Sequence, residues 1–172
     1  MQSAIRSIDA INRWIGRAAS LALLPMLVFA FTVVVLRYAF GLSYTWLQES
    51  YIWLNSVVFI GMVGYTLREE RHVRVDLLYS RLTPKGRAIV NIAGVILCIW
   101  PLIGVVLWSS YSPIMRSWRL LERSPNVGGL PFVYVHKSLI FAFCLLLMLQ
   151  GLSLLMKSIE VLRGRRTFEA SP

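Results

Sequence analysis

The stretch WLQESYIWLNSVVFIGMVGYTLREERHVRVDLL, residues 46–78, decides the fold class of this chain. Between Glu49 and Arg68 it carries no charge. As a helix this run, residues 50–67, would be about 27 Å long, close to the hydrocarbon thickness of a bilayer. The charged cluster REERH that follows marks the return to water. The stretch therefore predicts a membrane-spanning helix with a charged boundary at each end.

The composition extends this interpretation to the whole chain. Of its 172 residues 57% are hydrophobic and 15% are charged, and the charges lie in clusters between long apolar runs. A soluble domain of this size would not show that distribution. We therefore expect an all-α integral membrane protein with a single membrane domain, residues 1–172. The net charge of +10 sits in short segments beside apolar runs, which favours contact with membrane lipids over binding of nucleic acid.

Four membrane spans are predicted. They lie at residues 18–36, 50–67, 88–111 and 134–156. Pro25 predicts a mild kink in the first span, because proline lacks the N–H group that a helix interior uses. Pro101 and Gly104 predict an interruption of the third span, and Pro113 predicts its end.

The N-terminal segment, residues 3–17, has two chemically distinct faces. Isoleucines lie on one face and mostly basic residues on the other: Ile5, Ile8, Ile11 and Ile15 against Arg6, Asp9, Arg13 and Arg17. This pattern predicts a helix that lies in the membrane surface. A signal peptide is the alternative, but the apolar run that follows is too long for one. Short amphipathic helices are also expected after Asp76 and near Arg116, and residues 157–172 form a basic tail.

Lysine and arginine residues outside the spans and at their edges predict the orientation. Thirteen lie in the N-terminal segment, the second connection and the C-terminal tail, whereas five lie in the first connection, the third connection and the first turn of the fourth span. The more basic segments of a membrane protein face the cytoplasm, so both termini are expected there. Four residues are then expected at the cytoplasmic edge: Arg68, His72, Arg74 and Asp76.

A few side chains are candidates for packing within the hairpin or between subunits. Arg37 and Glu49 are expected at the outer boundary, where they could pair, although each could instead reach the headgroups separately. Trp46 fits an interfacial aromatic belt. Asn55 is expected to make polar contacts between helices, with a transport site as the alternative. Gly61 and Gly64 permit close approach of another helix.

The outer surface carries a second set of candidates. Four charged residues are predicted to dock a periplasmic protein, with a solvated basic helix as the alternative: Arg116, Arg119, Glu122 and Arg123. His72 and His136 are expected at opposite faces of the membrane, so they cannot share one metal ion. No catalytic residue, substrate-binding residue, metal ligand or cofactor is predicted, and the chain is not expected to be an enzyme.

Several short motifs follow one another in a characteristic order. They are Arg37-Tyr38, Trp46-Leu47-Gln48-Glu49, Gly61…Gly64-Tyr65…Arg68 and His72-Val73-Arg74-Val75-Asp76-Leu77-Leu78. In this order and at these span edges, the chain resembles the small membrane subunit, DctQ type, of tripartite ATP-independent periplasmic (TRAP) transporters. Residues 122–131, Lys137 and Leu149-Gln150-Gly151 resemble the longer branch often labelled for mannitol or chloroaromatic compounds.

The resemblance implies a secondary transporter in the bacterial inner membrane. In that family a periplasmic solute-binding protein, DctP type, delivers an organic acid to a pair of membrane subunits. The large multi-span subunit, DctM type, carries the substrate and sodium sites, and the small subunit is a stationary scaffold. Two alternatives from other classes are a membrane anchor for a haem oxidoreductase and a self-sufficient four-helix exporter. A haem absorbance band or transport by this chain alone would favour them.

Overall fold

The computed structural model describes residues 2–68 and 82–164, and within these ranges all regular structure is helical. The helices are α1 (Gln2–Leu21), α2 (Leu23–Ala39), α3 (Thr45–Arg68), α5 (Pro84–Gly94), the π-helix η1 (Val95–Ile99), α6 (Trp100–Arg119) and α7 (Val133–Leu162). The predicted all-α class is therefore confirmed.

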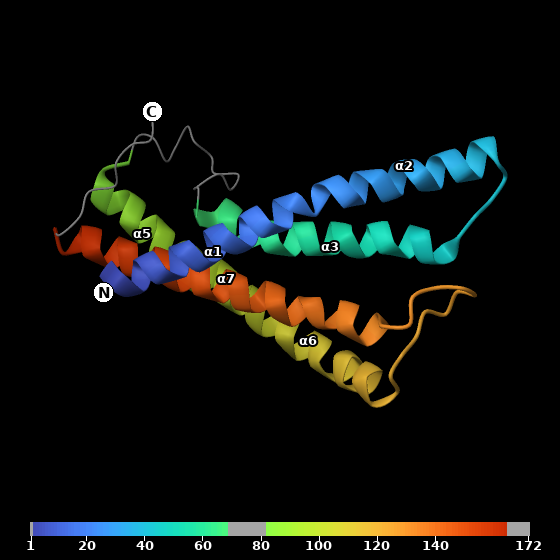
Figure 1. The fold of residues 1–172 in the computed structure, drawn as a ribbon. Helices are drawn as coiled ribbons and strands as arrows, with labels where there is room; N and C mark the ends of the chain where they lie inside the picture. The colour runs from blue at the N-terminus through green and yellow to red at the C-terminus, as the bar shows by residue number, and fades with distance from the viewer. Residues whose placement is uncertain (1, 69–81, 165–172) are drawn as a thin grey trace.

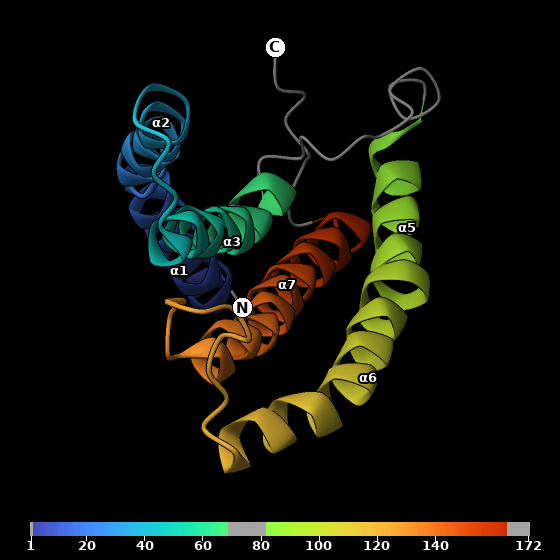
Figure 2. The same cartoon turned by 90° about the vertical axis from the view of Figure 1, so that its right-hand side faces the viewer.

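Two helical hairpins make up the body of the protein (Figure 1). α2 and α3 form the first, and α5, η1 and α6 form the second with α7. α3 packs against α7, and α1 packs against both of them. Viewed along the long axis, α7 lies between α3 and the α5–α6 arm (Figure 2). The connections at residues 40–44 and 120–132 share one end, the loop end; the N-terminus and the last turn of α7 share the other, the terminal end.

A one-residue break at Ala22 separates α1 from α2. Pro25 explains its position, because proline has no N–H to donate to the carbonyl of Leu21 four residues earlier. The N–H of Met26 bonds to the carbonyl of Ala22 at 3.1 Å, so the helix resumes at once. The sequence placed the end of a separate surface helix at residue 17, whereas the structure keeps one helix through that position to Leu21.

The third long helix begins at Pro84, four residues before the predicted span at residues 88–111. Thr83 is its N-cap, and its Oγ1 accepts a hydrogen bond from the N–H of Gly86 at 3.2 Å. The π-turn η1 precedes Pro101, and the N–H of Trp100 bonds five residues back to the carbonyl of Val95. An extra residue in the turn accommodates the missing proline donor, so the helix is interrupted just before Pro101, whereas it continues without a break through Gly104.

Pro113 does not end this helix, contrary to the prediction. α6 continues through Pro113 to Arg119 and absorbs the segment near Arg116 that was expected to form a separate short helix. A proline removes one backbone hydrogen bond, whereas ending a helix leaves several carbonyls without partners, and that is the larger cost in apolar surroundings. The helix therefore extends beyond the predicted span.

The buried core is formed mainly by the second hairpin. One cluster combines Ile103 of α6 with Cys144 and Leu147 of α7, and a second combines Val95 of η1 with Leu154 and Leu155 of α7. α2 buries none of its residues within this chain. Its wide apolar surface is therefore available to lipid or to another polypeptide.

Three segments of the described chain are long and apolar enough to cross a membrane: residues 5–39, 84–119 and 133–162. The remaining predicted span, residues 50–67, lies within α3, whose 24 residues extend about 36 Å as a helix. These apolar helices are those of an integral membrane protein.

Candidate functional site

The carboxylate of Glu49 holds the loop-end connection of the second hairpin onto the first. Oε2 accepts a hydrogen bond from the N–H of Leu130 at 2.6 Å, and Oε1 accepts from Nδ2 of Asn126 at 3.2 Å and from the hydroxyl of Ser124. Glu49 is in the second turn of α3, 75 residues before Ser124. We call these four residues the Glu49 cluster.

The environment of Glu49 keeps its carboxylate charged. Desolvation opposes ionisation, but the hydrogen bonds from Ser124, Leu130 and Asn126 outweigh it, so the pKa of Glu49 lies below its usual value of 4.5. Hydrogen bonds to a charged acceptor are stronger than those between neutral groups. At neutral pH the cluster therefore contains an anion with three donors directed at it.

Gly129 allows the loop to approach Glu49 this closely. A Cβ atom at that position would lie 2.7 Å from Oε1 of Glu49 and would also overlap the side chain of Ser124. The tip of the loop turns at Gly128, whose φ of +74° is a conformation that favours glycine. The two consecutive glycines thus have separate roles, one in the turn and one in the close contact.

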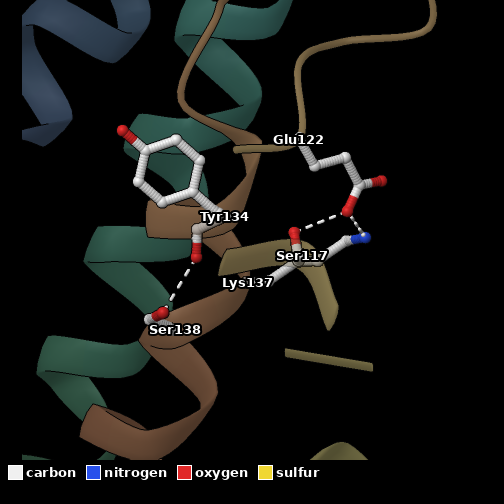
Figure 3. A network of polar contacts seen from close by, with 5 residues as sticks. All are labelled: Ser117, Glu122, Tyr134, Lys137 and Ser138. Carbon is white, nitrogen blue, oxygen red and sulfur yellow. Dashed lines mark hydrogen bonds and ion pairs between the residues drawn. The ribbon is translucent and has the colours of Figure 1, made fainter. Parts of the chain in front are cut away.

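A second acidic residue at the loop end is also engaged within the chain. Glu122 accepts hydrogen bonds from Lys137 of α7 and from Ser117 of α6 (Figure 3). Both donors, Lys137 first, lower the pKa of Glu122. This Glu122 cluster joins the end of α6 to the start of α7. Glu122, which the sequence proposed as a docking residue, thus has intramolecular partners.

Aromatic contacts complete the joint between the hairpins. Trp53 of α3 stacks on His136 of α7 with ring centroids 4.9 Å apart, and Nε2 of His136 lies 2.9 Å from the hydroxyl of Ser56. Within the second hairpin, Nε1 of Trp118 donates to Ser138 at 2.7 Å, and Ser138 donates to the carbonyl of Tyr134 (Figure 3). The contacts with Trp53 and Ser56 engage His136 in packing between α3 and α7.

The basic residues of the loop end remain exposed. Arg116, Arg119 and Arg123 are exposed, as is Arg37 at the end of α2. In the described part of the chain no ion pair joins Arg37 to Glu49, whose oxygens bond to the opposite loop instead. Because Glu49 and Glu122 are both engaged internally, the exposed charge of this end is positive.

A polar cluster near the terminal end fixes α1 to α7. Asp9 pairs with Lys157 at 2.6 Å and accepts a hydrogen bond from Ser153 at 2.7 Å. The buried Asn12 donates to Gln150 at 2.8 Å. We call these five residues the Asp9 cluster. The sequence predicts Asp9 on the polar face of α1, together with the arginines. In the structure its side chain instead contacts α7.

The other predicted packing residues have different surroundings. Gly61 lies against α1, where a Cβ would overlap that of Ala19. Asn55 and Trp46 are exposed on α3. Gly64 and Arg68 lie in the last turns of α3. Predictions for three cytoplasmic-edge residues lie outside the described part of the chain: His72, Arg74 and Asp76.

Ser124, Asn126 and Lys137 were not singled out as partners by the sequence. The available signal was a loop, SPNVGG, rich in hydrogen-bond donors and glycine, in a chain with few acids. Within residues 2–68 and 82–164, no group of three or more histidine, cysteine, aspartate or glutamate side chains is placed to bind a metal ion. The loop end thus combines polar contacts between helices with an exposed basic surface.

The described chain is thus all-helical, has segments long and apolar enough to cross a membrane, and joins its two hairpins through polar side chains. The family model for the DctQ component of tripartite ATP-independent periplasmic transporters matches residues 26–160. The chain therefore belongs to the DctQ family and is the small membrane subunit of a TRAP transporter. No curated protein and no solved structure matches it.

Proposed function

We propose that this chain is the stationary scaffold of a TRAP transporter that imports an organic acid. Its partners are a DctM-type large subunit, which carries the substrate and the coupling sodium ions, and a DctP-type solute-binding protein. The family match supports the assignment. The observation that carries the scaffold role is the pair of polar clusters, Glu49 at one end and Asp9 at the other, which resist changes in the relative tilt of the helices.

The proposed topology has four spans in the bacterial inner membrane, with both termini in the cytoplasm. The excess of lysine and arginine in the terminal segments and the second connection supports it. The loop end then faces the periplasm. The Glu49 and Glu122 clusters would lie on the side from which a binding protein arrives.

We further propose that Arg116, Arg119 and Arg123 guide the binding protein to the membrane. All three are exposed, and the neighbouring acids Glu49 and Glu122 are engaged within the chain. An exposed surface of one charge increases the rate of encounter with an oppositely charged partner more than it strengthens the final complex. The proposal therefore requires acidic residues on the docking face of the binding protein.

No enzymatic activity is proposed, and the chain is assigned no cofactor. The haem-anchor and self-sufficient exporter alternatives receive no specific support from the described contacts. His136, the histidine within the described residues, is stacked on Trp53 and lies beside Ser56. The ionisable pair Asp9–Lys157 belongs to the contact between α1 and α7, where Asp9 also accepts a hydrogen bond from Ser153.

The decisive test is purification of the tagged full-length chain from its native membrane. A large multi-span protein recovered in equal amount would support the assignment, and transport by this chain alone in liposomes would refute it. Docking is tested in liposomes containing both membrane subunits, with all three arginines at positions 116, 119 and 123 changed to glutamine. Uptake at limiting binding protein and low salt should fall about tenfold, and its salt dependence should flatten.

A matched control keeps the number and type of substitutions constant. α1 carries three exposed arginines outside the loop end, Arg6, Arg13 and Arg17. Changing these three to glutamine should leave the salt dependence of uptake unchanged. Equal effects of the two triple variants would show that overall charge, and not a docking surface, determines the rate.

A further inference from the structure

One face of α3 is left free by the rest of the chain. Ile52, Asn55 and Phe59 are exposed, and their spacing of three and four residues places them on one side of the helix. Two other sides of α3 contact neighbouring helices, since Gly61 lies against α1 and Trp53 stacks on His136 of α7. We call Ile52, Asn55 and Phe59 the free face of α3.

Asn55 is unusual on such a face because of its depth. It lies six residues from Glu49, about 9 Å along the helix, and about 20 Å from Arg68 at the other boundary. Its side-chain amide has two donors and an acceptor that hydrocarbon cannot satisfy. No hydrogen bond to this amide is found from any of the described residues. In lipid the group would lack partners at a considerable cost.

The exposed faces of α2 and α7 do not show this feature. α2 presents leucine and phenylalanine side chains, among them Leu24, Leu27 and Phe31, and α7 presents Leu145 and Met148. Such faces suit the acyl chains of lipids. The free face of α3 combines bulky apolar groups with one amide, a combination typical of contacts between transmembrane helices.

We propose that the free face of α3 binds a transmembrane helix of the large subunit, and that Asn55 forms a hydrogen bond with that helix. This inference rests on the proposed function. The occupant needs an apolar surface and a polar side chain or accessible carbonyl about 9 Å below the outer boundary. A second copy of this chain is disfavoured, because two copies would bring together chains of +10 charge with exposed arginines at their loop ends.

Photo-crosslinking in the intact complex tests the placement. Phe59 on α3 and Phe31 on α2 are matched in residue type and exposure, 65% and 67%. Each is replaced separately by the photoreactive benzoylphenylalanine. We expect a covalent adduct with the large subunit from position 59 and no protein adduct from position 31. An adduct between two copies of this chain, or with the large subunit from position 31 alone, would overturn the inference.

The role of the amide is tested by substitution at Asn55. Asn55→Leu should weaken retention of the large subunit about three- to twentyfold, as expected for one interhelical hydrogen bond in a membrane. Ile52→Leu, one turn away on the same face, should not. Equal retention by Asn55→Leu and wild type would remove Asn55 from the interface. Failure of wild type to retain any large subunit would refute the proposed function itself.

Discussion

Replacing Glu49 with glutamine should release the loop of residues 120–132. The wild-type carboxylate accepts from Leu130, Asn126 and Ser124. Glutamine retains one oxygen and presents an NH₂ group, so at least one of these donors loses a charged acceptor. A hydrogen bond to a charged group contributes about 1.5–3 kcal/mol, and access of water brings the expected loss to about 1–2 kcal/mol. Opening of the loop should then be about five- to thirtyfold more frequent.

Hydrogen exchange in lipid nanodiscs at pH 7 measures this opening directly. The amide of Leu130, bonded to Oε2 at 2.6 Å, should exchange five- to thirtyfold faster in the Glu49→Gln variant. Gln48→Ala is the matched control, since Gln48 bonds to Ser43 in the other connection. The reasoning is refuted if exchange of Leu130 is equal in Glu49→Gln and wild type, or equally accelerated in the control.

The same assay has a defined pH dependence. The pKa of Glu49 is lowered in the folded protein, so its contribution is complete above the ordinary value of 4.5 and declines as the pH falls through the lower folded-state value. Wild type should therefore keep its protection from pH 7 to pH 5 and approach the variant only under more acidic conditions. Convergence of the two proteins already at pH 6 would contradict the assigned cause.

Two further predictions concern helix packing. Gly61→Ala should force α1 and α3 apart at Ala19 and destabilise the protein by about 1–3 kcal/mol, which a lower melting temperature in detergent would show. Gly104→Ala is the control, because its added methyl group meets open space and should leave the melting temperature unchanged. Asp9→Asn should destabilise the protein by about 3 kcal/mol, because it leaves Lys157 unpaired in a site where both side chains are about 15% exposed. Adding Lys157→Gln to Asp9→Asn should restore most of that loss, and no recovery would show that the ion pair is not the cause.

Much of the fold follows from local features of the sequence. Charge-free runs of bilayer length predict the helices, and Thr83 followed by proline predicts the start of α5, because these effects act within one or two turns. The end of α6 was misplaced at Pro113. Proline is a reliable stop signal where water can satisfy the freed carbonyls, but apolar surroundings favour continuing the helix.

The polar contacts could not be obtained in the same way. Opposite charge and nearness in sequence suggest Arg37 as a partner for Glu49, yet the donors that reach it are Ser124, Asn126 and the Leu130 amide. These become neighbours only after α3 packs against α7. Asp9 is a similar case, because the pattern of α1 alone gives no sign of Lys157, which is fixed in position by α7.

The π-turn at residues 95–99 lets a proline follow within a long helix without changing the direction in which α6 presents its side chains. A π-turn holds one residue more than an α-turn, so the residues after it keep the alignment relative to α5 that a regular helix one residue shorter would give them. Removing one residue there would therefore leave Ile103 beside Cys144 and Ser117 beside Glu122. The ring of Pro101 would then meet the carbonyl four residues earlier. A single deletion in this turn would thus yield a chain that keeps the alignment of its second hairpin but is destabilised at Pro101.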